Sequence, residues 1–455
     1  MNQDQQIRNA PVKFWPTLLT MGPGIVIAAG VIGSGELINT PLQAAKFGFV
    51  LFWAVIFSCV IKYFLQVEVG RYCLTTNQTI FQVLCDFPGP KLRNVSWFVW
   101  LFMFGWVFAQ IGASGLVGAM SGLFHGITPL NPDTIRSIQI WGILIVAVAQ
   151  LILWKSLYQP LEKIMVSLTL ILSISAIVGL IMLQGTSYKI SIDDIFTGLS
   201  FSLGDTDIRL AAFAVLSLLG ALGVSGTELI AYPYWILEKG YGRYLGSPES
   251  PGWVTRAQGW VRILKFDVAL ATLLATVITC SYFLLGAAIL FKQGHVPSGI
   301  GVVEQISIIF TESYGPWAKI IFFVSALATL FSTLLAATAV SGRIVTDFLC
   351  TLNIVNRNRP KSIQTSHKVI QSIFLWSTLI LYLFFPERPG VMVILSHYII
   401  GVFGTPLVAI AVCWMAFRIN RSMRMSQPVA WLLVGSAVVI IGSVVLGLSA
   451  QSGLI

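Results

Sequence analysis

Long apolar segments alternate with short polar ones along the whole chain. Runs of about 20 apolar residues recur, and each is long enough to cross a bilayer as a helix. Within a run the apolar residues do not alternate with polar ones, which argues against the strands of a membrane β-barrel. A helix satisfies its own backbone hydrogen bonds in lipid. The pattern therefore predicts an all-α polytopic membrane protein.

Glycine, proline and charged residues divide the chain into eleven predicted transmembrane helices. Their expected ranges are 17–45, 48–72, 95–124, 137–154, 161–184, 210–240, 263–292, 316–347, 368–385, 390–417 and 428–449. Lysine and arginine on the side of the N-terminus outnumber those on the other side by about three to one. This bias predicts a plasma-membrane protein with a cytoplasmic N-terminus and an extracellular or periplasmic C-terminus.

Five spans followed by five more place two halves of the chain in opposite orientations. We expect a cytoplasmic N-terminal segment, a first repeat, an extracellular loop, a second inverted repeat and an appended eleventh helix. Their ranges are 1–16, 17–184, 185–209, 210–417 and 428–449. Inverted repeats of this kind are typical of secondary transporters that work by alternating access.

One short phrase occurs at the start of both halves. "GSGELINTP" begins at Gly33, and "SGTELIAYP" begins at Ser225. Glycine weakens a helix by up to about 1 kcal/mol per position relative to alanine, and proline removes a backbone donor. Helices 1 and 6 are therefore predicted to be broken, near 33–35 and 225–227. Such breaks are the best pointer in a sequence to a transporter's binding site.

Each phrase also carries one glutamate, Glu36 or Glu228, inside an otherwise apolar span. A carboxylate at the middle of a bilayer costs a few kcal/mol, so it usually lines a pathway or has a partner. The alternative is a structural carboxylate bonded to the amides of the broken helix. The predicted substrate-binding residues are Gly33, Ser34, Glu36, Ser225, Thr227, Glu228 and His397.

Three of the candidate residues have plain alternatives. His397, in span 10, could be an imidazole bonded to a neighbouring helix instead of a ligand or proton carrier. Ser332 and Thr333 could complete a sodium site with span 1 carbonyls. Hydroxyls in membrane helices more often bond their own backbone or a neighbouring helix.

Composition narrows the class of protein. The chain is 56% hydrophobic and 10% charged, whereas soluble domains are about a quarter charged. The net charge of +10 resides mostly in loops, so it reflects topology and not a nucleic-acid partner. No zinc-protease H-E-x-x-H or nucleotide-binding G-x-x-x-x-G-K-[ST] is present. We expect no enzyme activity, no cofactor, and a monomer whose partners are lipids and a small ion or solute.

Several longer stretches resemble the Nramp family of divalent-metal transporters. They are "GPGIVIAAGVIGSGELINTPLQAAKFGFVLFW", "LQVEVGR", "ALATLFSTLLAATAVSGRIVTDFL" and "VILSHYIIGVFGTPLVAI". The resemblance implies a leucine-transporter-type fold of two inverted five-helix repeats. It also exposes departures. The family's Asp-Pro-Gly-Asn is replaced by Gly33-Ser34-Gly35-Glu36, and its metal-binding Met in helix 6 has no counterpart between Met182 and Met392.

These departures fall on the family's metal site, so the substrate is weighed from the residues present. Two carboxylates with neutral oxygens suit a hard divalent cation such as Mg²⁺ or Mn²⁺, held between Glu36 and Glu228. A thioether that would favour soft metals is expected to be absent. The alternative substrate is a small non-metal solute, an anion such as bicarbonate or an amino acid, coupled to protons or sodium.

Overall fold

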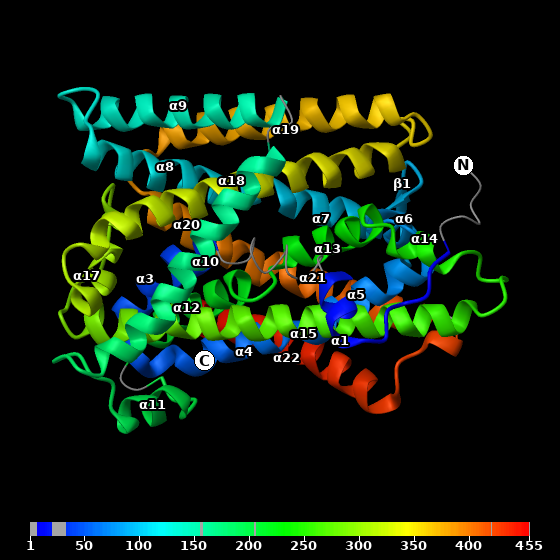
Figure 1. Ribbon diagram of the computed structural model, residues 1–455, viewed down its shortest axis with the longest axis horizontal. Helices are drawn as coiled ribbons and strands as arrows, with labels where there is room; N and C mark the ends of the chain where they lie inside the picture. The colour runs from blue at the N-terminus through cyan, green and yellow to red at the C-terminus, as the bar shows by residue number, and fades with distance from the viewer. Residues whose placement is uncertain (1–6, 21–32, 155–157, 204–205, 420, 455) are drawn as a thin grey trace.

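The computed structural model describes residues 7–20, 33–154, 158–203, 206–419 and 421–454, which are almost entirely helical. Most of the long helices run along one direction of the molecule, and short elements cover its two ends (Figure 1). The end with α11 and α17 is called the α17 end below, and the end with α6, α14 and β1 is called the α14 end.

The membrane-crossing helices are long and apolar, and several are assembled from two or three consecutive elements. In chain order they are α1 (Phe14–Thr20), η2 (Gly35–Asn39) and α3 (Thr40–Phe47); η3 (Gly48–Leu51), α4 (Phe52–Val60) and α5 (Lys62–Thr76); α7 (Trp97–Val107) and α8 (Ala109–Ile127); α9 (Thr134–Trp154); α10 (Tyr158–Leu183); α12 (Ile208–Ala221) and α13 (Gly226–Glu238); α15 (Trp253–Leu285) and η4 (Gly286–Phe291); α18 (Ala318–Thr351); α19 (Pro360–Phe384); α20 (Pro389–Ile399), η5 (Ile400–Gly404) and α21 (Thr405–Arg418); and α22 (Gln427–Ser452).

Short elements occupy the connections. They are α6 (Ile80–Leu84), β1 (Lys91–Leu92), β2 (Val95–Ser96), α11 (Ile192–Leu199), α14 (Tyr241–Leu245), α16 (Val302–Ile306), α17 (Ile308–Tyr314) and η6 (Arg421–Met423). The two strands form an antiparallel hairpin in which Lys91 pairs with Ser96. The predicted loop 185–209 thus contains a helix, α11, which starts with a capping box between Ser191 and Asp194.

The eleven predicted spans are confirmed. Among the described residues, ten helical stretches are long and apolar enough to cross a membrane, and the first of these, Gly35–Thr76, contains both the end of span 1 and the whole of span 2. The helices of spans 7 and 9 begin at Trp253 and Pro360, eight to ten residues before the predicted starts at 263 and 368. An apolar pattern marks only the part of a helix inside lipid, and these helices extend beyond it through polar residues.

The packing of the helices repeats with inverted symmetry. The end of span 1, α3, packs against η4 of span 7, and the equivalent half of span 6, α13, packs against α5 of span 2. Span 3 contacts span 10 through α8 and α20, just as span 8 contacts span 5 through α18 and α10. Exchanging each helix for the one five positions away converts one set of contacts into the other. This relation is that of two five-helix repeats, with α22 outside them.

Span 6 is broken, but three residues earlier than the sequence predicted. α12 ends at Ala221, residues 222–224 are not helical, and Ser225 is the N-cap of α13. The Ser225 side chain accepts a hydrogen bond from the amide of Glu228, so helix resumes directly after it. Gly223 has φ +65°, a left-handed conformation that glycine adopts without strain.

Span 1 is described in two parts, up to Thr20 in α1 and again from Gly33. Residues 21–32, including the predicted helix-weakening Gly30, lie outside the described residues. The chain bends at Gly33 and is helical from Ser34, first as the wide-turned π-helix η2. The prediction of non-helical backbone over 33–35 therefore holds for Gly33 alone among these three. A π-turn of this kind often marks a functional site in a helix.

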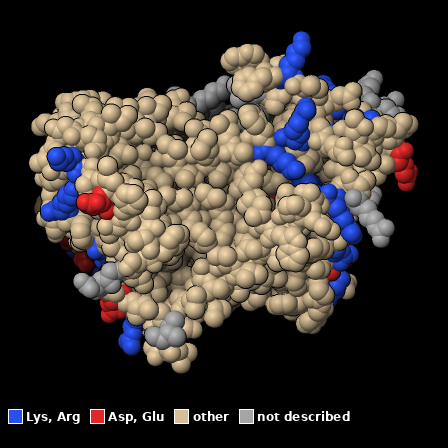
Figure 2. Space-filling model, turned by 90° about the horizontal axis from the view of Figure 1, so that it is seen from below, with Lys and Arg blue, Asp and Glu red and all other residues tan. Residues whose placement is uncertain are grey.

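Charged side chains are sparse on the long faces of the molecule. Figure 2 shows most of the lysine, arginine, aspartate and glutamate side chains near the two ends, with a wide uncharged surface between them. The long helices also expose large apolar residues, such as Val148, Ile181, Ile320 and Val438. Such a band is what lipid tails would cover.

Candidate functional site

A cavity of about 190 Å³ lies where the two broken spans meet. Its wall includes most of the site residues predicted from the sequence: Gly33, Ser34, Ser225, Thr227, Glu228, Ser332, Thr333 and His397. Only Glu36 of the predicted set is not part of this wall. The structure thus brings together residues that are up to 364 positions apart, from spans 1, 6, 8 and 10.

The two breaks approach each other closely at glycine. A Cβ atom added to Gly35 would lie 3.3 Å from the carbonyl oxygen of Ala221, the last residue of α12. A Cβ atom at Gly220 would lie only 1.8 Å from the carbonyl oxygen of His397 in α20. Gly220 therefore serves close packing between helices, whereas Gly223 serves the left-handed turn. The two glycines at the break of span 6 therefore have different roles, one in packing and one in the turn.

Glu228 is fixed by the start of its own helix and faces the cavity. Its Oε2 accepts a hydrogen bond from the amide of Ser225 at 2.7 Å, and its own amide donates to Ser225 Oγ at 3.3 Å. Ser225 Oγ also lies 2.8 Å from Thr227 Oγ1. This capping box orients the carboxylate, which is half-buried and belongs to the cavity wall.

Glu36 makes the same local bond but occupies a different environment. Its Oε2 accepts a hydrogen bond from the amide of Gly33 at 3.1 Å, the same three-residue spacing as in the other repeat. Its Oε1 accepts a second bond, from Thr279 Oγ1 of α15 at 3.2 Å. The side chain is fully buried and stands behind the cavity wall. Glu36 and Glu228 nevertheless lie close enough to interact electrostatically.

The remaining predicted residues border the cavity with different amounts of free polar surface. Ser332 and Thr333 both donate to the carbonyl oxygen of Thr329, at 2.9 Å, so their hydroxyl protons bond their own helix. Among the described residues, Nδ1 of His397 has no hydrogen-bond partner. His397 lies one turn before the π-helix η5, which bends span 10 beside the site.

Sequence reasoning underrated Lys62. This lysine of span 2 is 1% exposed, and its Nζ donates to the carbonyl oxygen of Leu222, in the break of span 6, at 2.6 Å. Its charge acts on both Glu36 and Glu228. A lone lysine in the middle of an apolar run was the available signal, because charges at this depth usually have a function.

The ligand set of the cavity is dominated by oxygen. Within the described residues, no group of three or more His, Cys, Asp or Glu is placed to hold a metal ion. One thioether is present, because Met165 of α10 borders the cavity. The expectation that no thioether would be available is therefore wrong for the cavity, although span 6 has no methionine. Hydroxyl, carbonyl and carboxylate oxygens favour hard cations.

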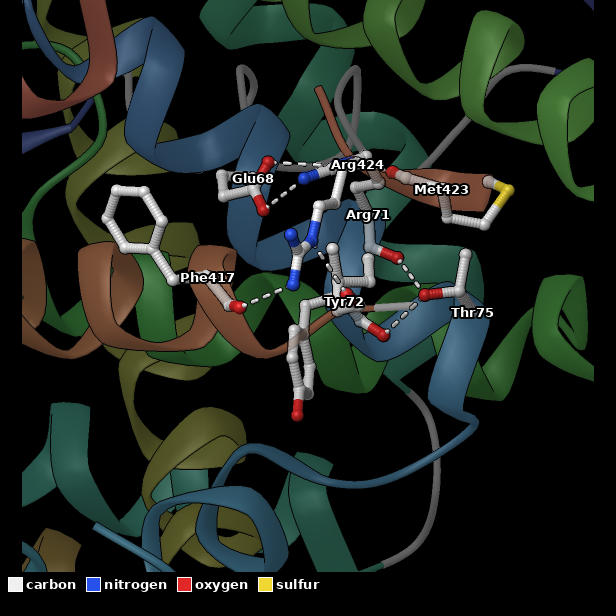
Figure 3. A network of polar contacts seen from close by, with 8 residues as sticks. Glu68, Arg71, Tyr72, Thr75, Phe417, Met423 and Arg424 are labelled. Atoms are coloured by element: carbon white, nitrogen blue, oxygen red, sulfur yellow. Dashed lines mark hydrogen bonds and ion pairs between the residues drawn. The ribbon is translucent and has the colours of Figure 1, made fainter. Parts of the chain in front are cut away.

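A separate buried ion pair lies toward the α14 end of span 2. Arg71 donates to Glu68 through Nε at 2.8 Å and through Nη2 at 2.5 Å. Arg71 Nη1 also donates to the carbonyl oxygen of Met423, which belongs to η6 between spans 10 and 11 (Figure 3). This pair joins span 2 to the 10–11 connection.

Toward the α17 end, α8 packs closely against its neighbours at two glycines. There α8 packs tightly on α20, since a Cβ atom at Gly115 would lie 2.8 Å from the carbonyl oxygen of Pro389. A Cβ atom at Gly122 would lie 2.1 Å from that of Ile300. In the other direction, the wall continues along α13 to Trp235 and along α18 to Ser341.

Comparison with known proteins agrees with this arrangement of broken spans. A sequence model of the family described as "Natural resistance-associated macrophage protein-like", Nramp, matches residues 24–450. The chain belongs to the Nramp family. Nramp proteins are multi-pass membrane transporters, so the chain is a transporter and not an enzyme.

Similar proteins extend this result to sequence and to fold. A protein of Erwinia tasmaniensis named "Divalent metal cation transporter MntH" is 24% identical, over 84% of this chain and 88% of its own. A Yersinia enterocolitica protein of the same name is 25% identical over 72% of each chain. The structure of a mutant manganese transporter of Eremococcus coleocola superposes with a TM-score of 0.65, at 13% identity, over 97% of this chain and 90% of its own.

A second solved structure has a similar fold. The structure of MhsT in complex with L-phenylalanine superposes with a TM-score of 0.57 at 15% identity, over 98% of this chain and 100% of its own. At such low identity the likeness concerns the fold alone. The leucine-transporter-type fold expected from the resemblance is therefore confirmed, and the described residues show the break in helix 6.

Proposed function

We propose that the protein is a secondary transporter of a hard divalent cation, similar to Mg²⁺ or Mn²⁺, in the plasma membrane. The observation that carries the proposal is the cavity-facing carboxylate of Glu228, held by the Ser225 amide where two broken spans meet. The names of the Erwinia and Yersinia relatives, divalent metal cation transporters, support the same substrate class.

In the proposed site Glu228 is the direct ligand and Glu36 contributes the second negative charge. Hydroxyl oxygens of Ser225 and Thr227 and carbonyl oxygens of Gly33 and Ser34 complete an oxygen shell, with water in the remaining positions. A hard cation accepts such a shell. His397 and the Ser332–Thr333 pair lie on the same wall, where they contact the ion's water or a coupling cation.

The close packing of α8 on α20 toward the α17 end, and a cavity wall that reaches Trp235 of α13 and Ser341 of α18, support transport by alternating access. If the N-terminus is cytoplasmic, as the lysine and arginine distribution predicts, this conformation faces the cytoplasm. The repeats would then exchange it for an outward-facing one by separating α8 from α20. The five-part division of the chain into an N-terminal segment, two repeats, an external loop and an appended helix belongs to the same proposal.

The alternative substrate is a small anion such as bicarbonate, or an amino acid, coupled to protons or sodium. Two observations favour it. The N-terminus of α13 borders the cavity and attracts negative charge, and Lys62 adds a positive charge nearby. Under this alternative, protonated glutamates would donate hydrogen bonds to the ligand, so acid would strengthen binding.

The deciding experiment measures binding of Mn²⁺, Mg²⁺, bicarbonate and amino acids to the purified protein from about pH 5 to 8, followed by uptake into liposomes. A carboxylate binds a metal only when deprotonated, so cation binding must weaken as pH falls. Glu228→Gln should abolish it, and Glu304→Gln, at an exposed pair with Lys319, should not change it. Tighter cation binding in acid, or wild-type affinity in Glu228→Gln, would refute the metal site.

A further inference from the structure

Lys62 is a buried cation whose hydrogen bond ties two membrane spans together. Its side chain is 1% exposed. An ammonium at this depth is costly unless it is paired. Its partner is the carbonyl oxygen of Leu222, 2.6 Å from Nζ, and Leu222 is the first residue after α12.

The position of Leu222 makes this bond more than a local contact. The carbonyl groups at the C-terminus of a helix carry partial negative charge and lack partners within the helix. In broken transporter helices, such carbonyls bind cations. Gly223 brings this end of α12 against span 2, since a Cβ atom there would lie 3.0 Å from Cα of Cys59. Lys62 therefore fills a position that a free cation would otherwise take.

Lys62 also acts on the charge of the transport site. Its ammonium interacts electrostatically with the carboxylates of Glu36 and Glu228 and with His397. The two carboxylates and one ammonium together leave a net charge of about −1, in place of −2 for the carboxylates alone.

We propose that Lys62 is a resident counter-cation of the transport site, which limits the affinity for a divalent ion by occupying the Leu222 carbonyl and offsetting one carboxylate charge. The inference rests on the proposed function, in which Glu228 and Glu36 attract a divalent cation. Electrostatic energy is proportional to the charge of the ion. Lys62 therefore opposes a divalent ion twice as strongly, in free energy, as a monovalent one, and it favours release of the transported ion.

Three variants separate charge from hydrogen bonding. Lys62→Gln removes the charge but keeps a donor that can reach Leu222, Lys62→Met removes both, and Lys62→Arg keeps both. Titration calorimetry with Mn²⁺ on purified protein at pH 7 should show tighter binding in the Gln and Met variants, by about tenfold or more. The Arg variant should stay within about twofold of the wild type. Bicarbonate serves as the probe of opposite charge.

The outcomes distinguish this inference from the function on which it rests. If the wild-type protein binds Mn²⁺ and the folded Gln and Met variants bind it no more tightly, only the inference is overturned and the proposed function stands. If the proteins bind bicarbonate and none of them binds Mn²⁺, the proposed function is overturned, and the inference is overturned with it. If only the Arg variant folds, Lys62 is a structural cap, and the inference is again overturned.

Discussion

Removing one partner of the ion pair between Glu68 and Arg71 should be among the most destabilising single changes outside the transport site. The contact is bidentate, and the two side chains are 3% and 4% exposed. Removing one partner of a buried pair leaves an unpaired buried charge, which costs about 3–5 kcal/mol. Arg71→Met should cost more than Glu68→Gln, because it also removes the bond to the Met423 carbonyl (Figure 3).

The assay is equilibrium unfolding in mixed micelles of increasing dodecyl sulfate content, followed by circular dichroism. The double variant Glu68→Gln/Arg71→Met should be less destabilised than the sum of the singles, since neither charge remains unpaired. Lys91→Met is the matched control, because its pair with Asp86 is exposed and 3.9 Å long and is worth at most about 1 kcal/mol. Single variants as stable as this control would refute the reasoning.

Three further predictions concern packing, capping and selectivity. Gly220→Ala should destabilise the protein by about 1–3 kcal/mol or prevent folding, because its Cβ would collide with the His397 carbonyl. Gly435→Ala, whose Cβ would have nothing within 4 Å, should be neutral, and thermal unfolding compares the two variants. Ser225→Ala should cost about 1 kcal/mol and weaken Mn²⁺ binding, while Ser191→Ala, in the capping box of α11, should leave binding unchanged by calorimetry. In competition assays, Cd²⁺ should bind no more than about tenfold tighter than Mn²⁺, and Met165→Leu should leave that ratio unchanged. A marked cadmium preference that is lost in Met165→Leu would show that the thioether is a ligand.

Much of the fold followed from the sequence, because apolar run length and the repeated phrase are local signals. The start of α13 was also accessible. Ser225-Gly226-Thr227-Glu228 fits the S-x-x-E capping box, which places the N-cap at Ser225 and the break before it. The short helices of the connections lack an apolar run, so α14 and α16 have no comparable signal in the sequence.

The candidate site was predictable as a set of residues but not as a geometry. Thr279, which binds Glu36, is 243 positions away in the chain, and Leu222, which binds Lys62, is 160 positions away. Neither partner has a sequence pattern that relates it to its glutamate or lysine. The same holds for Met165, whose place at the cavity depends on how α10 packs on α18. Contacts of this kind depend on tertiary packing alone.

The two glutamates of the repeated phrases should differ in function, and their glutamine variants can show it. In both variants the amide oxygen can still accept the bond from Gly33 or Ser225, so the broken helices should remain intact. Glu228→Gln removes a charge and a cavity-facing ligand, whereas Glu36→Gln removes a charge held behind the wall by Thr279. The first should abolish Mn²⁺ binding, and the second should weaken it by about tenfold to a hundredfold. Equal loss in both variants, with no further loss in the double variant, would mean that Glu36 leaves Thr279 and coordinates the ion together with Glu228. Unchanged binding in Glu36→Gln would mean that its charge does not act on the ion at all, and calorimetry on the three proteins at pH 7 distinguishes these results.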